Sequence, residues 1–346
     1  MLAEGEIYAA EGVIRQFLQT RPNHVEGMRL LAHIGVKLDV LDDAEFLLES
    51  ALEFDPDNRA VRYDYATVLL QRHKHTQALE QARVLLQLES ANRAYRTVHA
   101  NACVGLGDHA AALSTYRDLL AGAPQPADLH LSIAHALKTL GRQGEAIEAY
   151  RAAAEARPGF GDAYWSLANL KTYRFTDDEI ARMRSQESQP AARPVDRFHL
   201  CFALGKAFED RREYARSFGF YERGNALKKA ESRYQPETLE RTCQLTADLC
   251  TPAFFEQRRG SGCLRADPIF IVGLPRAGST LLEQILASHS KVEGTMELAD
   301  VARLVHRLNG RQELGAPPRY PQALAELAAE DLRRFGEKYL ADTQIF

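Results

Sequence analysis

Small side chains recur along the first half of the chain with a period of 34 residues. One series of alanines, each 34 residues after the last, consists of Ala32, Ala66, Ala100, Ala134 and Ala168. A second series with the same spacing consists of Ala10, Ala44, Ala78, Ala112 and Ala146. A fixed period of this length is typical of stacked helix–turn–helix units. The two series stand twelve residues apart, so one lies on each helix of a unit, where a small side chain lets the paired helices approach closely.

Turn residues keep the same period. Prolines recur at Pro22, Pro56, Pro124 and Pro158, where they stop the second helix of each unit. Gly107–Asp108 and Gly141–Arg142 form the turns inside two of the units. The expected units are residues 25–58, 59–92, 93–126, 127–160 and a partial unit from 161, and residues 1–24 supply one further second helix. This pattern resembles tetratricopeptide repeats, which implies a mainly helical α-solenoid.

The register of the repeat fails after residue 171. Thr176 and Glu179 form a capping box that predicts a helix start. A divergent helical pair follows near 197–230, and residues 236–258 are expected to form one more helix. We therefore predict three regions: tetratricopeptide repeats over 1–175, divergent helical repeats and a linker over 176–260, and an α/β domain over 267–346.

The third region opens with a short apolar run between two prolines, residues 269–274, which predicts a buried strand of a parallel sheet. A glycine-bearing turn and an amphipathic helix, residues 281–288, follow it. A strand, turn and helix in this order can hold an anion on backbone N–H groups and on the positive end of the helix dipole. The spacing from Gly273 to Thr280 nearly matches a P-loop, but Ser279 stands where a nucleotide-triphosphate loop has its lysine. This argues against a kinase or NTPase.

The stretch LPRAGSTLLEQILASHS, residues 274–290, resembles the 5′-phosphosulfate loop of sulfotransferases that use 3′-phosphoadenosine 5′-phosphosulfate (PAPS). The whole chain is similar to bacterial proteins that join tetratricopeptide repeats to a sulfotransferase domain. The resemblance implies that PAPS is the co-substrate and that no metal is needed. It places the donor on Arg276, on the hydroxyls of Ser279 and Thr280, and on the backbone N–H groups of residues 277–281, namely Ala277, Gly278, Ser279, Thr280 and Leu281.

A sulfotransferase also needs a base for the acceptor hydroxyl. The resemblance places this base on Glu297, with Glu293 as the competing residue. His289 is a third candidate, although a role at the end of the preceding helix is favoured for it. Structural roles stay open too, because Glu297 can cap a helix, and Ser279 and Thr280 can begin one without any ligand.

No segment after the loop matches the family's site for the nucleotide 3′-phosphate. We therefore expect a C-terminally truncated sulfotransferase domain that holds the donor half of the site. This polypeptide alone is expected to bind PAPS weakly or not to turn it over.

The composition of the chain indicates which classes of partner and which compartment to expect. The net charge of −4 argues against nucleic acid, and no apolar run is long enough to span a membrane. The N-terminus lacks a basic, apolar leader, and the five cysteines show no paired spacing, which indicates a cytoplasmic protein with reduced thiols.

The repeat groove is expected to recruit a protein or peptide. Its concave positions lack the set of cations that captures a C-terminal carboxylate in chaperone adaptors; these positions are Arg29, His33, Tyr63, Thr67, Asn101, His135 and Asn169. The leading hypothesis is a PAPS-dependent sulfotransferase acting on a protein, peptide or glycan hydroxyl. The alternative is an interaction scaffold of repeats with an inactive nucleotide-binding domain.

Overall fold

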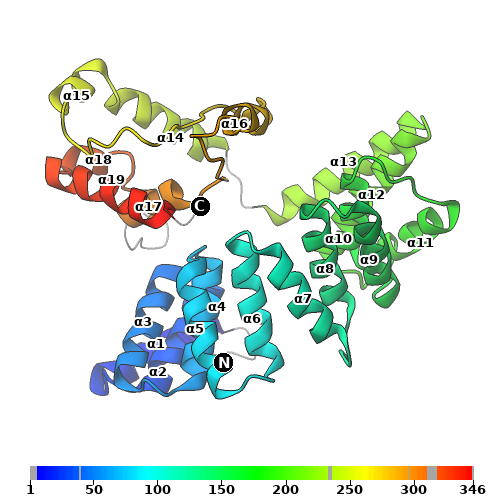
Figure 1. Cartoon of the computed structure of the whole chain (residues 1–346), viewed down its shortest axis with the longest axis horizontal. Helices are drawn as coiled ribbons and strands as arrows, with labels where there is room; N and C mark the ends of the chain where they lie inside the picture. Colours follow the sequence, from blue (N-terminus) through cyan, green and yellow to red (C-terminus); the bar gives the residue numbers. More distant parts are fainter. Residues whose placement is uncertain (1–5, 39, 233–235, 296, 310–317, 345–346) are drawn as a thin grey trace. The chain divides into compact units, whose positions relative to one another are not determined.

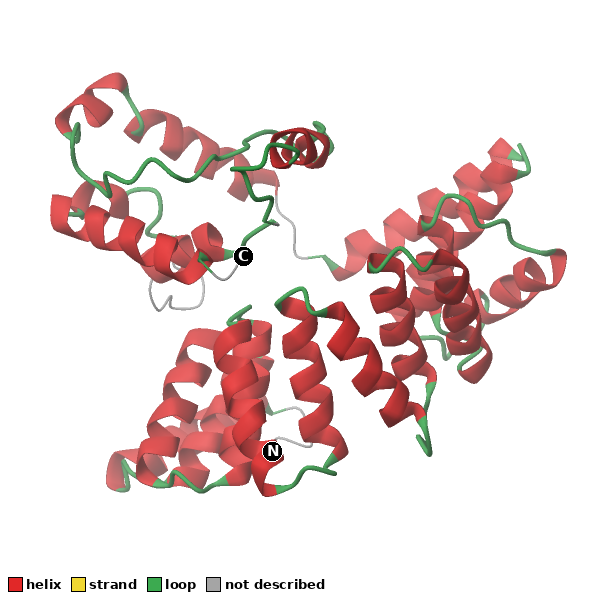
Figure 2. Ribbon diagram, in the orientation of Figure 1, coloured by secondary structure: helices red, strands yellow, loops and turns green. Residues whose placement is uncertain are grey.

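The computed structural model describes residues 6–38, 40–232, 236–295, 297–309 and 318–344. The chain divides into two compact units, Met1–Arg233 (unit 1) and Tyr234–Phe346 (unit 2). Within the described residues all regular structure is helical, and Figure 2 shows red helices joined by green loops with no yellow strand.

Unit 1 is a run of helices (Figure 1). Its helices are α1 Ile7–Thr20, α2 Val25–Lys37, α3 Leu41–Phe54, α4 Arg59–Gln71, α5 His75–Leu88, α6 Arg93–Gly105, α7 His109–Leu120, α8 Ala127–Thr139, α9 Gln143–Ala156, α10 Gly161–Asn169, α11 Asp177–Glu187, α12 Pro194–Asp210 and α13 Tyr214–Glu231. Each helix packs against the next along the chain from α1 to α10, after which α10, α11 and α13 all pack on α12. The helical pairs predicted from the 34-residue period are confirmed.

The recurring alanines lie where the helices meet. Both series are buried, and eight of the ten have no exposed surface at all; these are Ala32, Ala66, Ala100, Ala134, Ala44, Ala78, Ala112 and Ala146. A methyl group at these positions lets two helix backbones come together without a cavity or a clash. Large side chains fill the space between neighbouring pairs, and Tyr116 and Tyr150 are almost fully buried there.

Side-chain caps set where the helices begin. Asn58 accepts a hydrogen bond from the N–H of Val61 at 3.1 Å, and Asn92, one period later, accepts one from the N–H of Ala94 at 3.0 Å. Each cap satisfies a donor that the first helical turn leaves open. The predicted capping box at the start of α11 is confirmed, because Thr176 and Glu179 bond reciprocally.

The divergent pair α12 and α13 packs through small residues as well. A Cβ atom added to Gly205 would lie 2.6 Å from the ring of Tyr221, so the two helices approach closely at this glycine. The buried hydroxyl of Ser217 donates to the carbonyl of Gly205 at 2.7 Å. This contact holds the last helical pair of unit 1 together.

Unit 2 has little core. Its helices are α14 Pro236–Leu249, α15 Pro252–Gln257, α16 Ser279–Ala287, α17 Asp300–Asn309, α18 Ala323–Glu326 and α19 Ala329–Thr343. Among its described residues only Pro321 and Ala323 are buried. The single helix expected over 236–258 is wrong: Pro252 lacks the N–H that would continue α14, and Thr251 caps a new helix instead.

The strand expected over residues 269–274 is also absent. This segment forms neither helix nor strand, and Val272 and Leu274 are 89% and 82% exposed. A strand is held by hydrogen bonds to a neighbouring strand. No described segment pairs with this one, so the parallel sheet is not found in the described residues.

The closest backbone approach in unit 1 can be tested at Gly161. A Cβ atom there would lie 2.3 Å from the backbone carbonyl oxygen of Asp196, which cannot move aside as a flexible side chain can. We expect Gly161→Ala to lower the free energy of unfolding by roughly 1–3 kcal/mol in denaturant titration.

Gly219→Ala is the matched control for this prediction. Gly219 lies inside α13 and has open space around its Cα hydrogen. Alanine there should stabilise the helix by about 0.5–1 kcal/mol. Equal effects of the two substitutions would contradict the close packing of α10 on α12.

Candidate functional site

A tight turn precedes α16. The N–H of Ala277 donates to the carbonyl of Leu274 at 3.1 Å, with Pro275 and Arg276 between them. Proline sets a negative φ at the first central position, and Arg276 has a φ of +67° at the second. These features define a type II turn, in which the second central position normally holds glycine or asparagine. An arginine is therefore kept in a backbone conformation that disfavours it.

The start of α16 leaves donors open. Gly278 is the N-cap with a φ of +91°, and no side chain caps the helix. The first helical bond runs from the N–H of Leu282 to the carbonyl of Gly278 at 3.0 Å. No described residue accepts a hydrogen bond from the four backbone N–H groups of residues 278–281. Four unpaired donors and the positive end of a helix dipole make this turn suitable for an anion.

The side chains of the turn are exposed. Arg276, Ser279 and Thr280 all lie at the surface, and Arg276 forms no ion pair with any described residue. The structure thus brings the guanidinium, the two hydroxyls and the open N–H groups into one turn. The N–H of Ala277 is already engaged within that turn.

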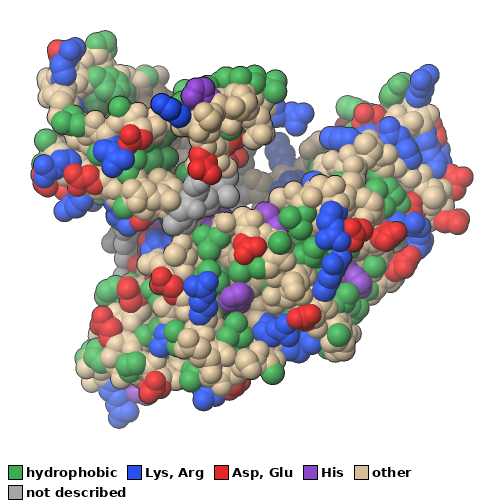
Figure 3. Space-filling model, viewed as in Figure 1, with side chains coloured by type: hydrophobic (Ala, Val, Ile, Leu, Met, Phe, Trp, Pro, Cys, Tyr) green, Lys and Arg blue, Asp and Glu red, His purple; other side chains and the backbone are tan. Residues whose placement is uncertain are grey.

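Apolar surface adjoins the turn. Leu281 is 68% exposed and Ile285 58% exposed. Hydrophobic side chains gather over α16 in Figure 3. Exposed apolar surface of this kind can contact the non-polar parts of a bound molecule or protein.

The acid–base candidates lie between α16 and α17. Glu297 and Glu293 are exposed, and no described residue of the turn forms a hydrogen bond or an ion pair with either. His289 accepts a hydrogen bond at Nδ1 from the N–H of Lys291 at 3.1 Å, which holds the turn after α16. Gly294 lies beside Glu283, so the segment that carries Glu293 runs back along α16.

The described residues contain no group of three His, Cys, Asp or Glu side chains close enough to hold a metal ion. Burial raises the pKa of the Cys103 thiol, and it raises the pKa of Cys201 to about 11. Both thiols are therefore protonated near neutral pH and are poor nucleophiles.

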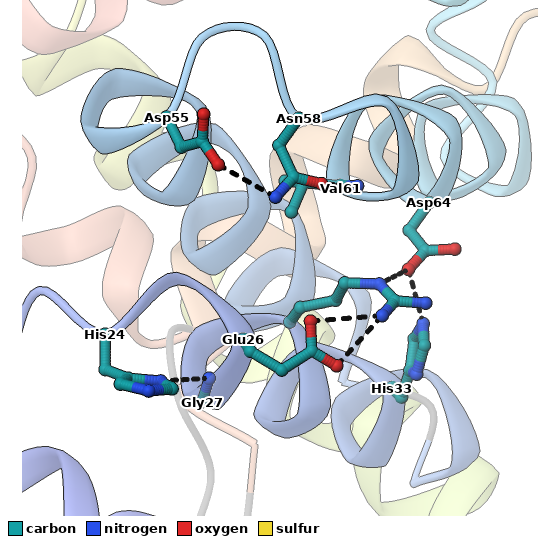
Figure 4. A network of polar contacts seen from close by, with 9 residues as sticks. His24, Glu26, Gly27, His33, Asp55, Asn58, Val61 and Asp64 are labelled. Carbon is teal, nitrogen blue, oxygen red and sulfur yellow. Dashed lines mark hydrogen bonds and ion pairs between the residues drawn. The ribbon is translucent and has the colours of Figure 1, made fainter.

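The first repeats tie their polar groove residues to one another. Arg29 on α2 donates to the carboxylate of Asp64 on α4 at 2.6 Å, and it also pairs with Glu26 (Figure 4). His33 contacts the same carboxylate oxygen at 2.6 Å. The sequence predicted Arg29 and His33 as groove residues but gave no signal for Asp64. Asp64 lies 35 residues after Arg29 and so is not at the equivalent position of the next repeat.

Two buried tyrosines contact groove residues through their hydroxyl groups. The hydroxyl of Tyr116 donates to Oδ1 of Asn101 at 2.6 Å, and the hydroxyl of Tyr150 lies 2.9 Å from Nδ1 of His135. Each pair joins the two helices of one unit at positions fifteen residues apart. The contacts orient Asn101 and His135, which sequence reasoning had named only as groove residues.

Comparisons with known proteins agree with both parts of the chain. Residues 268–343 match the model of the sulfotransferase family, and residues 127–160 match the model of the tetratricopeptide repeat. The latter range is the fourth predicted unit. Residues 37–119 match the repeat-bearing model of subunit 3 of the anaphase-promoting complex, or cyclosome. The chain thus joins tetratricopeptide repeats to a segment of the sulfotransferase family.

One individual relative matches over about half of this chain. An uncharacterized protein of Aquifex aeolicus is 32% identical over 173 residues, which is 49% of this chain and 23% of that protein. The match therefore spans about a quarter of that relative's length. No described helix is long and apolar enough to cross a membrane.

Two solved structures show a loose likeness to this chain. A tetratricopeptide repeat protein from Parabacteroides merdae is 16% identical, with a TM-score of 0.49 over 71% of this chain and 94% of its own. MamA from Desulfovibrio magneticus is 15% identical, with a TM-score of 0.43 over 45% of this chain and 89% of its own.

Four histidines predict acid sensitivity of unit 1. Partial desolvation lowers the pKa of these side chains below the ordinary value of 6.5, although none of them is fully buried; they are His99, His130, His135 and His199. As the pH falls through 6.5 the unfolded chain takes up protons that the folded chain resists. The free energy of unfolding should therefore decrease below pH 6.5 until the lower folded pKa values are reached.

The measurement is chemical denaturation of the full chain between pH 8 and pH 5. His135→Gln keeps a hydrogen-bond acceptor for Tyr150 but cannot titrate, so it should reduce the loss of stability at acidic pH. His289→Gln, in unit 2, should leave that loss unchanged. An unaltered acid slope in the His135 variant would refute this assignment.

Proposed function

We propose that this chain binds the phosphosulfate of PAPS at the turn before α16, as the donor site of a sulfotransferase. The observation that supports this most directly is the set of four N–H groups at residues 278–281, beside the guanidinium of Arg276, that no described residue pairs with. Arginine offers a planar fork of donors to phosphate and sulfate oxygens. The match of residues 268–343 to the sulfotransferase family supports the same reaction class.

In the proposed reaction the acceptor oxygen attacks the sulfur of PAPS. The new bond joins this oxygen to sulfur, and the bond from sulfur to the bridging oxygen breaks. Adenosine 3′,5′-bisphosphate leaves with the electron pair of the broken bond, and the acceptor proton passes to a base. Negative charge grows on the bridging and sulfuryl oxygens, so fixed donors that face them lower the barrier.

Each proposed side chain has one part in this step. Arg276 and the hydroxyls of Ser279 and Thr280 donate to the phosphosulfate, together with the N–H groups of Gly278 and Leu281. Ala277 closes the turn that presents them. Glu297 is proposed as the base, since the exposed carboxylate lies on the segment that follows α16.

The solenoid is proposed to recruit the protein, peptide or glycan that carries the acceptor hydroxyl. The first repeats are unsuited to capture of a terminal carboxylate, because Arg29 is already paired with Asp64 and Glu26. The regions proposed for these roles are 1–175 for the repeats, 176–260 for the divergent helices and linker, and 267–346 for the donor segment.

The donor site is tested by binding of adenosine 3′,5′-bisphosphate, the product of PAPS, to the full chain. Arg276→Ala should weaken binding by at least tenfold, because a charged hydrogen bond is worth about 1.5–3 kcal/mol. Arg276→Gly should lose as much affinity although it relieves the strained φ, which costs about 1 kcal/mol. Nuclear magnetic resonance shifts of the residue 277–282 amides provide the measurement.

Two outcomes would contradict the donor site. Tighter binding of Mg-ATP than of the bisphosphate would indicate a nucleotide-triphosphate site instead. Shifts of amides outside the turn with unchanged affinity in the Arg276 variants would place the nucleotide elsewhere. Lys291→Ala, which removes a nearby exposed cation outside the turn, is the matched control and should retain binding.

The base is tested by turnover. At saturating PAPS, which offsets weak binding, Glu297→Gln should abolish any transfer of radiolabelled sulfate that the unchanged chain supports to a panel of phenols, tyrosyl peptides and oligosaccharides, with nucleotide affinity unchanged. Glu293→Gln is the control and should remain active. If only the Glu293 variant were inactive, the base would be Glu293.

A further inference from the structure

The period of the solenoid is kept at α7, but the helix itself is shorter. The second helices α3, α5 and α9 each have 14 residues, whereas α7 has 12 and ends at Leu120. The connection to the next helix therefore runs over residues 121–126, in place of the four residues 55–58 between α3 and α4. Gly122 adopts a φ of +72°, and Pro124 and Pro126 prevent the helix from continuing.

An open cavity of about 420 Å³ lies beside the shortened helix. We call this cavity the α6–α8 slot. Thr97 and Asn101 line it from α6, Asp128 and Ser132 line it from α8, and Tyr116 lies on α7 between them. Residues 123–125 of the longer connection also line it. Figure 1 shows these three helices in succession along unit 1.

The polar groups of the α6–α8 slot are mostly hydrogen-bond acceptors. The hydroxyl of Thr97 donates a hydrogen bond to the backbone carbonyl of Arg93 at 2.9 Å, and the hydroxyl of Ser132 donates one to the backbone carbonyl of Asp128 at 2.9 Å. Both oxygens can then only accept from a ligand. The carboxylate of Asp128 adds two further acceptor atoms, of which one lies 3.4 Å from Arg157.

The cationic side chain in the lining, Arg93, already forms hydrogen bonds within the chain. The guanidinium of Arg93 donates a hydrogen bond to the carbonyl of Leu119 and lies 3.4 Å from the carbonyl of Ala121. It therefore caps the C-terminal end of α7. Asn101 is held by Tyr116 through its carbonyl oxygen, which leaves its amide N–H groups as donors. The remaining walls are apolar and include Ala94, Leu119 and Pro124.

We infer that the α6–α8 slot binds an arginine or lysine side chain of a peptide partner. The aliphatic stem lies along the apolar walls and the charged head donates to Asp128, Ser132 and Thr97. The amide of Asn101 donates to a carbonyl of the peptide backbone. This inference deepens the recruiting role proposed for the solenoid, and it is tested without a sulfate donor, so the two proposals can fail separately.

The probe is the capped tripeptide acetyl-Gly-Arg-Gly-amide, titrated into the full chain with labelled alanine methyl groups. The methyl signals of Ala94 and Ala123, which line the slot, should shift with saturation, and the analogous Glu tripeptide should leave them in place. Absence of shifts with the Arg tripeptide would overturn the inference. Equal binding of agmatine, which has the same head and no peptide backbone, would overturn the assignment to a peptide.

Substitutions locate the charge that is recognised. Asp128→Asn should weaken binding of the Arg tripeptide by about two- to fivefold, and Asp128→Arg should reverse the preference toward the Glu tripeptide. Asp118→Asn is the matched control, because Asp118 is an exposed carboxylate on α7 outside the slot and should not alter affinity. Equal losses in the Asp118 and Asp128 variants would show a general charge effect and would refute the slot.

A variant without a charge change guards against misfolding. Ser132→Ala keeps α8 and the carboxylate of Asp128 but removes one hydrogen-bond acceptor from the slot. Binding of the Arg tripeptide should fall about two- to threefold, while the melting temperature is retained. Unchanged affinity in this variant and in Asp128→Asn would exclude the proposed head-group contacts.

Discussion

Close approach of paired helices at small residues is the constraint on which unit 1 depends. The buried alanines at both positions of the repeat admit the backbones to contact distance, and tyrosines fill the spaces between neighbouring pairs. Where the alanine period ends, glycine takes over the same task, at Gly161 against Asp196 and at Gly205 against Tyr221. Because each unit buries its surface only against its neighbours, the stability of such a solenoid is shared along the array.

The same packing supplies the polar side chains of the groove with their orientation. Tyr116 and Tyr150 are buried between helices, yet each ends in a hydroxyl that contacts a groove residue. The packing thus does more than stabilise the helices, since it also sets which donors and acceptors face a partner. At α7 the helix is two residues shorter although the period is kept, and an open slot lies beside it.

Unit 2 has a different organisation. The turn before α16 is defined by local geometry alone: a type II turn, a left-handed glycine and the first turn of α16. Little of its surface is buried, and the apolar residues of 269–274 and α16 face outward. An anion cradle made of consecutive backbone groups does not require a core to have its shape. This explains why the loop could be recognised in the sequence although the surrounding sheet is not found in the described residues.

The sequence by itself determined the repeat register, the capping box at Thr176 and the glycine-bearing turn before α16. Each of these depends on residues within one helix or one turn, so a period or a short motif is enough to predict it. Tertiary structure alone decided that Asp64 holds Arg29 and His33, that α14 ends before Pro252, and that α6 and α8 flank an open slot. These features arise where helices distant in the sequence meet or where the repeat deviates from its average, and the positions of the backbones, rather than any local pattern, decide which side chains come together there.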